Sequence, residues 1–149
     1  MMRAVGFAIV GLALLYVNPA YGQRKISSHE ERLLGAILSC PQGLLALQAG
    51  PVYESDGVSD GPRVLDAHTP TYPQRLQRRG ISGSVTLRFV LDTLGKVEPC
   101  SMEVQEASRE EFILSAVLAV LQTKFKPAEH QGNTVRVRMV QPVRFNVFR

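Results

Sequence analysis

The residues that carry most metal and nucleophile chemistry are scarce in this chain of 149 residues, which has two cysteines, three histidines and no tryptophan. His29, His68 and His130 lie in three different segments, without a short ligand spacing or a neighbouring cysteine pair, so the sequence predicts no metal site. The chain also lacks a nucleophile elbow, and no phosphate-loop lysine follows the glycines around residues 80–83. These absences predict a protein that is not an enzyme and uses no cofactor or small-molecule substrate.

The excess of positive over negative charge is also small. The formal net charge is +4, and no run of lysine and arginine is interleaved with aromatic residues. Nucleic-acid binding normally needs such a basic patch. The sequence therefore predicts no nucleic-acid partner.

The longest apolar run, residues 4–17, is shorter than the roughly 20 residues that a membrane-spanning helix needs. Arg3 precedes it, and Ala20-Tyr21-Gly22 places small residues where signal peptidase cuts. We therefore expect residues 1–22 to be a signal peptide and the protein to be periplasmic. The alternative is an uncleaved anchor that holds the chain on the inner membrane, facing the periplasm.

Two cysteines, Cys40 and Cys100, remain after export to a compartment where disulfides persist. Only one intramolecular pairing exists for them, so a Cys40–Cys100 bridge is one interpretation. Two unrelated buried thiols are the other.

Residues 23–68 are expected to form a helical extension and a linker. Ser28 and Glu31 have the spacing of a capping box, and apolar residues at helical spacing then predict a helix over residues 30–39. Residues 49–62 are rich in Gly, Pro, Asp and Ser, which is typical of a loop.

Residues 69–149 show the pattern of a small α+β domain. Pro73 and Gly80 flank a short predicted helix over residues 74–79, and residues 84–91 alternate as a strand with one buried face. A turn at residues 92–96 leads to a return strand over 97–105. Ser108 and Glu111 then predict a capping box for a helix that ends near residue 125, before a last strand over residues 134–148. This order predicts two helices packed on a three-stranded antiparallel sheet.

Pro142 lies inside the last predicted strand. Proline cannot donate a hydrogen bond to a neighbouring strand, so it belongs at an edge strand or a bulge. We therefore expect the last strand to be a sheet edge, which can pair with an incoming strand.

Short motifs over about 80 residues match a known pattern. They are Pro70-x-Tyr72-Pro73, Gly80-x-x-Gly83, Val85, Phe89, Leu91-Asp92-x-x-Gly95-x-Val97, Phe125-x-Pro127-Ala128, Gly132 and Pro142-x-x-Phe145. In this order and spacing they resemble the C-terminal domain of the TonB family. The resemblance implies a module that binds outer-membrane transporters, with an extended segment of the transporter added beside the last strand.

Carried over to this chain, the resemblance predicts a partner-binding edge on the last strand. Its residues are Arg136, Val137, Arg138, Met139, Val140, Gln141 and Arg144. The predicted partner is an envelope protein, in the first place an outer-membrane transporter of the TonB-dependent class. Two alternatives remain: a membrane-anchored TonB-type transducer, and a homodimer or larger homo-oligomer formed through the sheet edge. The arginines Arg88, Arg136, Arg138 and Arg144 also have a simpler interpretation, in which they keep the surface soluble and pair with Glu98 or Glu103.

Overall fold

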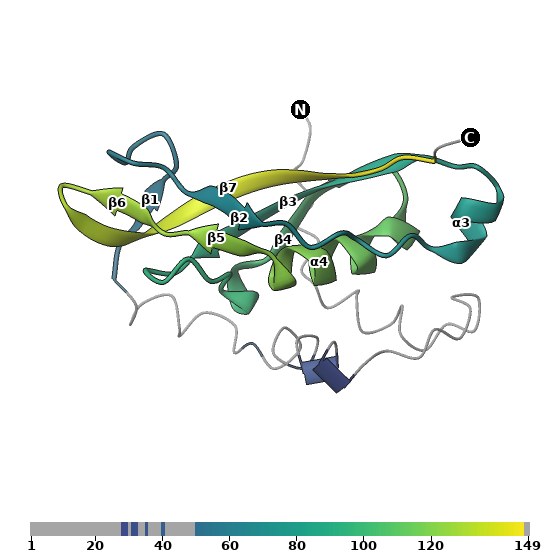
Figure 1. Ribbon diagram of the computed structural model, residues 1–149, viewed down its shortest axis with the longest axis horizontal. Coiled ribbons are helices and arrows are strands. Elements are labelled where there is room, and N and C mark those ends of the chain that lie inside the picture. The colour runs from purple at the N-terminus through teal and green to yellow at the C-terminus, as the bar shows by residue number, and fades with distance from the viewer. Residues whose placement is uncertain (1–27, 30, 33–34, 36–39, 41–49, 148–149) are drawn as a thin grey trace, which may run out of the picture.

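The computed structural model describes residues 28–29, 31–32, 35, 40 and 50–147, and residues 50–147 form an α+β domain (Figure 1). The domain has seven strands, two α-helices and two short 3-10 helices. In chain order these are β1 (Val52–Glu54), β2 (Arg63–Asp66), α3 (Gln74–Arg78), β3 (Gly83–Leu91), η2 (Pro99–Ser101), β4 (Glu103–Ala107), η3 (Glu110–Phe112), α4 (Ile113–Gln122), β5 (Lys124–Lys126), β6 (Ala128–His130) and β7 (Asn133–Phe145).

The main sheet has five strands in the order β1-β7-β3-β4, with β6 also paired to β7. The pairs β3–β4, β3–β7 and β6–β7 are antiparallel, whereas β1 runs parallel to β7. A separate two-stranded sheet joins β2 to β5. The predicted α+β class is confirmed, and the three predicted antiparallel strands correspond to β3, β4 and β7. Strands β1 and β6 enlarge the sheet beyond the prediction.

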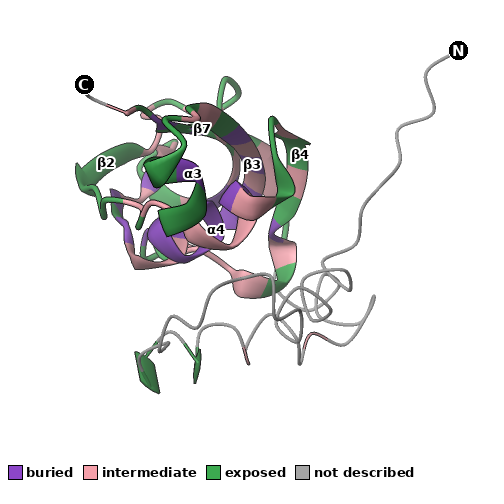
Figure 2. Cartoon of the chain, turned by 90° about the vertical axis from the view of Figure 1, so that its right-hand side faces the viewer, coloured by how far each residue is buried: buried purple, intermediate pink, exposed green. Residues whose placement is uncertain are grey.

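The core lies between α4 and the inner face of the sheet (Figure 2). Alternate residues of β3 point into it, including Val85, Leu87 and Phe89, each 0% exposed. From α4, Val117 and Val120 fill the opposite side. This is the alternation that a strand with one buried face produces.

An aromatic cluster closes the end of the core beside α3. The rings of Phe112 and Phe145 stack with centroids 4.3 Å apart, and Tyr72 contacts both edge-on at 5.7 Å. The Tyr72 hydroxyl donates a hydrogen bond of 2.7 Å to the Ile81 carbonyl. The ring of Tyr72 therefore joins the segment before α3 to the start of β3.

The tight turn after β3 depends on two residues. Asp92 Oδ1 accepts hydrogen bonds from the backbone N–H groups of Leu94 and Lys96. Gly95 takes a φ of 76°, a left-handed conformation that glycine adopts readily. A side chain at Gly95 would lie 2.3 Å from the Phe125 carbonyl oxygen, so the turn also packs closely against β5.

Three local predictions need correction. The return strand is shorter than predicted, because only Val97 bridges to Leu91 before η2 interrupts the pairing, and β4 begins at Glu103. Ser108 does not cap the following helix: its hydroxyl accepts the N–H of Ser84 instead. The predicted loop over residues 49–62 contains the strand β1.

The predicted signal peptide, residues 1–22, lies outside the described residues, as does most of the predicted helix over residues 30–39. Both stay predictions, as do the proposed boundaries at residues 22 and 68. Within the described ranges, no helix combines the length and apolar character needed to cross a bilayer.

Candidate docking edge

The last strand, β7, has different neighbours along its two sides. On one side β3 pairs with residues 137–145, and β6 takes over for residues 133–135. On the other side β1 pairs only with residues 136–138. Among the described residues, residues 139–145 therefore have no strand on the side away from β3. We call this stretch the open edge.

Hydrogen bonds on β3 show which backbone groups of β7 face the open edge. The Ser84 and Val90 carbonyls accept hydrogen bonds of 2.9 Å from Ser108 and Glu98, on the side of β4. Backbone groups alternate along a strand, so the odd-numbered residues of β3 direct their N–H and C=O groups toward β7. Their register partners, the odd-numbered residues of β7, direct theirs back toward β3. Val140, Pro142 and Arg144 are the alternate positions, so their backbone groups face outward.

The position of Pro142 follows from this alternation. Its register partner is Thr86, whose backbone groups face β4. The missing N–H of Pro142 therefore costs no hydrogen bond between β3 and β7. The sequence-based inference that Pro142 marks an edge holds for this part of the strand.

Side chains on the solvent side of β7 give the open edge a basic and partly apolar character. Val140 is 56% exposed, which is unusual for a β-branched residue in a central strand. The Arg138 guanidinium pairs with Glu54 of β1 at 2.6 Å. Arg144 makes no ion pair with the described residues. The edge thus offers one unpaired cation beside an exposed apolar side chain.

Arg136 has a structural role instead. Its residue is only 9% exposed, and its guanidinium donates two hydrogen bonds of 2.6 Å to the Glu98 carboxylate and one of 2.8 Å to the Gly50 carbonyl. The hydrogen bonds to Glu98 raise the pKa of Arg136 above its usual value. Arg136 therefore ties the segment before β1 to the turn that follows β3.

These contacts redraw the edge expected from the sequence. Arg136 is buried against Glu98, Val137 is 0% exposed in the core, and Arg138 is paired with Glu54 of β1. The prediction that the whole strand is an edge is wrong for these three residues, because β1 pairs with them on the side away from β3. The other four predicted residues lie within the open edge: Met139, Val140, Gln141 and Arg144.

Strand β1 itself was missed. Its sequence, Val52-Tyr53-Glu54, contains the β-branched and aromatic residues that strands favour. The surrounding Gly, Pro, Asp and Ser residues hid this signal, since they are typical of loops.

The segment after β1 is fixed by Asp60. Its backbone exchanges two hydrogen bonds of 2.9 Å with Glu129 of β6. Its carboxylate pairs with Lys126 at 2.5 Å and Arg63 at 2.7 Å, and these hydrogen bonds lower its pKa from 3.8 to about 2. Asp60 therefore anchors the chain to β5 and β6, six residues beyond the end of β1.

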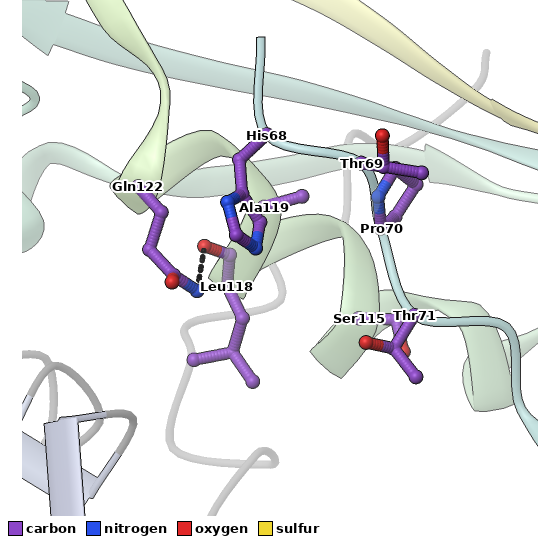
Figure 3. Close-up of a pocket in the computed structure, with 8 residues that line it drawn as sticks. All are labelled: His68, Thr69, Pro70, Thr71, Ser115, Leu118, Ala119 and Gln122. Atoms are coloured by element: carbon purple, nitrogen blue, oxygen red, sulfur yellow. Dashed lines mark hydrogen bonds between the residues drawn. The ribbon is translucent and has the colours of Figure 1, made fainter. Parts of the chain in front are cut away.

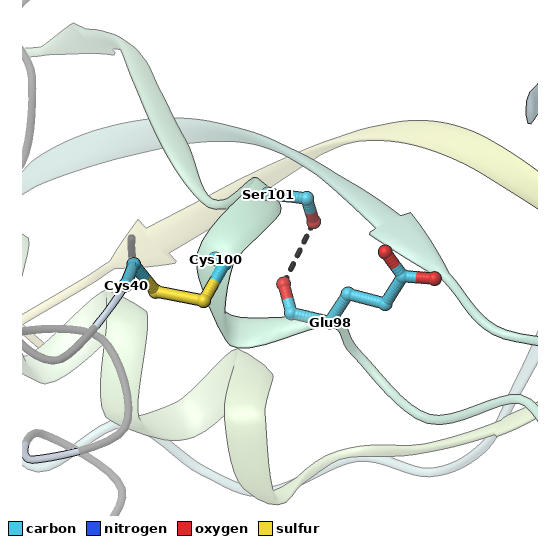
Figure 4. The surroundings of a disulfide bond; sticks show 4 residues. All are labelled: Cys40, Glu98, Cys100 and Ser101. Carbon is cyan, nitrogen blue, oxygen red and sulfur yellow. Dashed lines mark hydrogen bonds between the residues drawn. A yellow bond between two sulfur atoms is a disulfide. The ribbon is translucent and has the colours of Figure 1, made fainter. Parts of the chain in front are cut away.

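A disulfide joins Cys40 to Cys100, with Cα atoms 5.3 Å apart (Figure 4). The structure thus contains the bridge that the sequence allowed. Cys100 lies in η2, next to Ser101, whose hydroxyl donates to the Glu98 carbonyl and accepts the N–H of Val90. The bridge attaches the N-terminal extension to the same turn that holds Arg136.

A shallow hollow lies between residues 68–71 and α4 (Figure 3). His68 is the only titratable side chain among its lining residues, so the hollow presents neither a carboxylate nor a thiol. The His68 backbone N–H donates to the Thr123 hydroxyl, which in turn donates to the Ala119 carbonyl. Within the described ranges, no group of three or more His, Cys, Asp or Glu residues is placed to hold a metal ion.

Comparison with known families gives this geometry its context. The family model for the C-terminal domain of the Gram-negative bacterial TonB protein matches residues 68–147. The chain belongs to the TonB C-terminal family. Domains of this family are protein-interaction modules of the cell envelope, and their partners are outer-membrane transporters.

A solved structure supports the same assignment. The solution NMR structure of the Pseudomonas aeruginosa TonB CTD is 25% identical in sequence and superposes with a TM-score of 0.51. The match covers 61% of this chain and 90% of the Pseudomonas chain. No curated protein matches the sequence. The TonB-like part of the chain is therefore the domain that carries the open edge.

Proposed function

We propose that this protein is a periplasmic binding module of the TonB family that docks on an outer-membrane transporter, or on another envelope protein, by strand addition. The observation that carries the proposal is the open edge of β7, residues 139–145. Its outward backbone groups are available to an extended partner segment. Arg144 and Val140 beside them suit a segment with a carboxylate and an apolar side chain.

Pro142 also bears on self-association through the same edge. In any antiparallel pairing of two open edges, both strands contribute a Pro142 without an N–H group. Each copy then offers only the N–H groups of Val140 and Arg144. A partner segment without proline retains all of its own donors, so the edge suits a different protein better than a second copy.

Replacing Val140 by proline tests the proposal directly. This change removes an outward donor and leaves the β3–β7 hydrogen bonds in place, because the N–H of Val140 faces away from β3. Val140→Thr is the matched control, since it alters the side chain and keeps the donor. A photo-cross-linking residue at Asn146, just beyond the edge, reports on docking in the native envelope.

We expect a cross-link at Asn146 to a segment of an outer-membrane transporter, identified by mass spectrometry. The adduct should be lost in Val140→Pro and kept in Val140→Thr. Leu94, 71% exposed at the tip of the β3 turn, is the negative-control site for the cross-linker. An adduct that persists in Val140→Pro, or forms equally from Leu94, would contradict strand addition at this edge.

The anchored-transducer alternative depends on whether residues 1–22 are cleaved. The N-terminal residue of the protein purified from envelopes separates the two: Gln23 indicates a released periplasmic module, and Met1 indicates an anchored one.

A further inference from the structure

Strand β1 occupies part of the edge that a partner strand would extend. It runs parallel to β7, with Val52, Tyr53 and Glu54 in register with residues 136–138. In effect it is an added strand supplied by the same chain. Its end at Glu54 is where the open edge begins.

Weak contacts hold β1 in place. None of its three residues belongs to the buried core. The Glu54 carboxylate pairs with Arg138, but the two side chains are 60% and 33% exposed, and exposed ion pairs contribute little. Besides the backbone pairing of β1 with residues 136–138, the ring of Tyr53 lies 5.1 Å from that of His130. Just before β1, the Gly50 carbonyl accepts a hydrogen bond from Arg136.

The open edge alone offers few backbone donors. Of its three outward positions, Pro142 has no N–H, which leaves Val140 and Arg144. By the same alternation, the backbone groups of Arg136 and Arg138 also face outward, toward β1. A partner strand that displaced β1 would therefore have four backbone donors available instead of two.

From these observations we infer that β1 is a displaceable internal strand that competes with the partner for β7. The segment it stands in for is extended, runs parallel to β7, and carries a carboxylate at the position facing Arg138, as Glu54 does. The inference rests on the proposed docking at β7. It adds that the chain regulates access to its own binding edge.

The neighbouring anchors allow β1 to leave without unfolding the domain. On one side Asp60 remains fixed to Glu129, Lys126 and Arg63. On the other side the Cys40–Cys100 bridge keeps the extension attached. Residues 55–59, which include Gly57, lie between β1 and the Asp60 anchor. A released β1 therefore stays close to its site.

Amide hydrogen exchange on the full, oxidised chain tests whether β1 opens. The N–H of Arg138 faces β1, whereas those of Val137 and Met139 face β3. We expect Arg138 to exchange at least 100-fold faster than both neighbours, because it needs only local opening. Equal protection at the three positions would overturn the inference. This measurement involves no envelope protein, so its outcome is separate from the cross-linking test of the proposed function.

A peptide of residues 50–56 tests competition for the site. Val137 turns toward β3, so its register partner Tyr53 is the residue of β1 whose backbone groups face β7. Tyr53→Pro removes that N–H, whereas Val52→Pro, the matched control, places proline where the N–H points away. We expect the peptide to shift the Arg136 and Arg138 amide resonances of the Tyr53→Pro chain with a Kd at least ten-fold lower than in Val52→Pro.

The same peptide with glutamine in place of Glu54 should bind the Tyr53→Pro chain at least three-fold more weakly, because it lacks the carboxylate for Arg138. Equal affinity for the two variant chains would show that β1 does not compete for the edge, and equal affinity of the two peptides would remove the acidic requirement. Either result overturns the corresponding part of the inference.

Discussion

Replacing Arg136 by methionine should destabilise the domain strongly, although the residue lies on the sheet surface that was expected to bind a partner. The change removes two hydrogen bonds of 2.6 Å to Glu98 and one of 2.8 Å to Gly50. It leaves the Glu98 side chain, only 27% exposed, without its cation. Hydrogen bonds to charged groups contribute about 1.5–3 kcal/mol each in favourable cases, and breaking a buried pair costs about 3–5 kcal/mol. Because Glu98 retains some contact with water, we expect a loss of about 2–3 kcal/mol.

Urea unfolding of the oxidised protein measures this loss, and the m-value should stay constant. A loss of this size corresponds to a decrease in Tm of roughly 10–20 °C for a domain of about 100 residues. Arg138→Met is the matched control, since its partner Glu54 is 60% exposed, and it should cost under about 1 kcal/mol. The double variant Glu98→Gln with Arg136→Met should lose clearly less than the sum of the single changes. Strict additivity, or an equal loss at Arg136 and Arg138, would refute this account of Arg136.

Three further predictions concern the bridge, one carboxylate and one glycine. Replacing Cys40 and Cys100 by serine opens a loop with a sequence separation of 60 and should lower the free energy of unfolding by up to about 4 kcal/mol; an unchanged melting temperature under reducing conditions would contradict it. Asp60 has a folded-state pKa of about 2, below its ordinary 3.8, so the stabilisation that its carboxylate provides is present above pH 4 and is lost as the pH falls toward 2. Asp60→Asn should flatten the decline in Tm over that interval. An identical decline in both proteins would count against this account. Gly95→Ala should cost about 3 kcal/mol in thermal unfolding, because its Cβ would meet a carbonyl oxygen at 2.3 Å, whereas Gly132→Ala, at a similar positive φ in open space, should cost about 1 kcal/mol; similar losses at both would show that the close contact is unimportant.

The elements that the sequence predicted well are those whose signal is local. The alternation of Val85, Leu87 and Phe89 identifies β3 because every second residue enters one core. Pro73 and Gly80 bracket α3 for reasons of backbone geometry that hold in any context. The family motifs extend over the same region, 68–147, that the family model matches.

The features that the sequence could not predict depend on distant partners. β1 is a strand because β7 presents a free side to it 84 residues later, and three residues of local propensity cannot reveal that. Ser108 has the spacing of a helix cap, yet its hydroxyl accepts the N–H of Ser84, because the β3–β4 pairing brings that donor within 2.9 Å. By sequence, Arg136 is one of several arginines expected on the surface. Only the fold shows that its guanidinium donates hydrogen bonds to Glu98 and Gly50. The missed β1 is the reason why the free part of the last strand begins at residue 139 and not at Arg136.

The central position of β7 also constrains the order in which the domain can fold. β1, β3 and β6 all pair with this strand, and its partner Val52 lies 84 residues away in the chain. Before β7 is available, the main sheet can form no more than the β3–β4 hairpin, and contacts of such long sequence separation form slowly. A chain truncated within β7 should therefore fail to fold, and a nascent chain should stay unfolded until its central strand is complete.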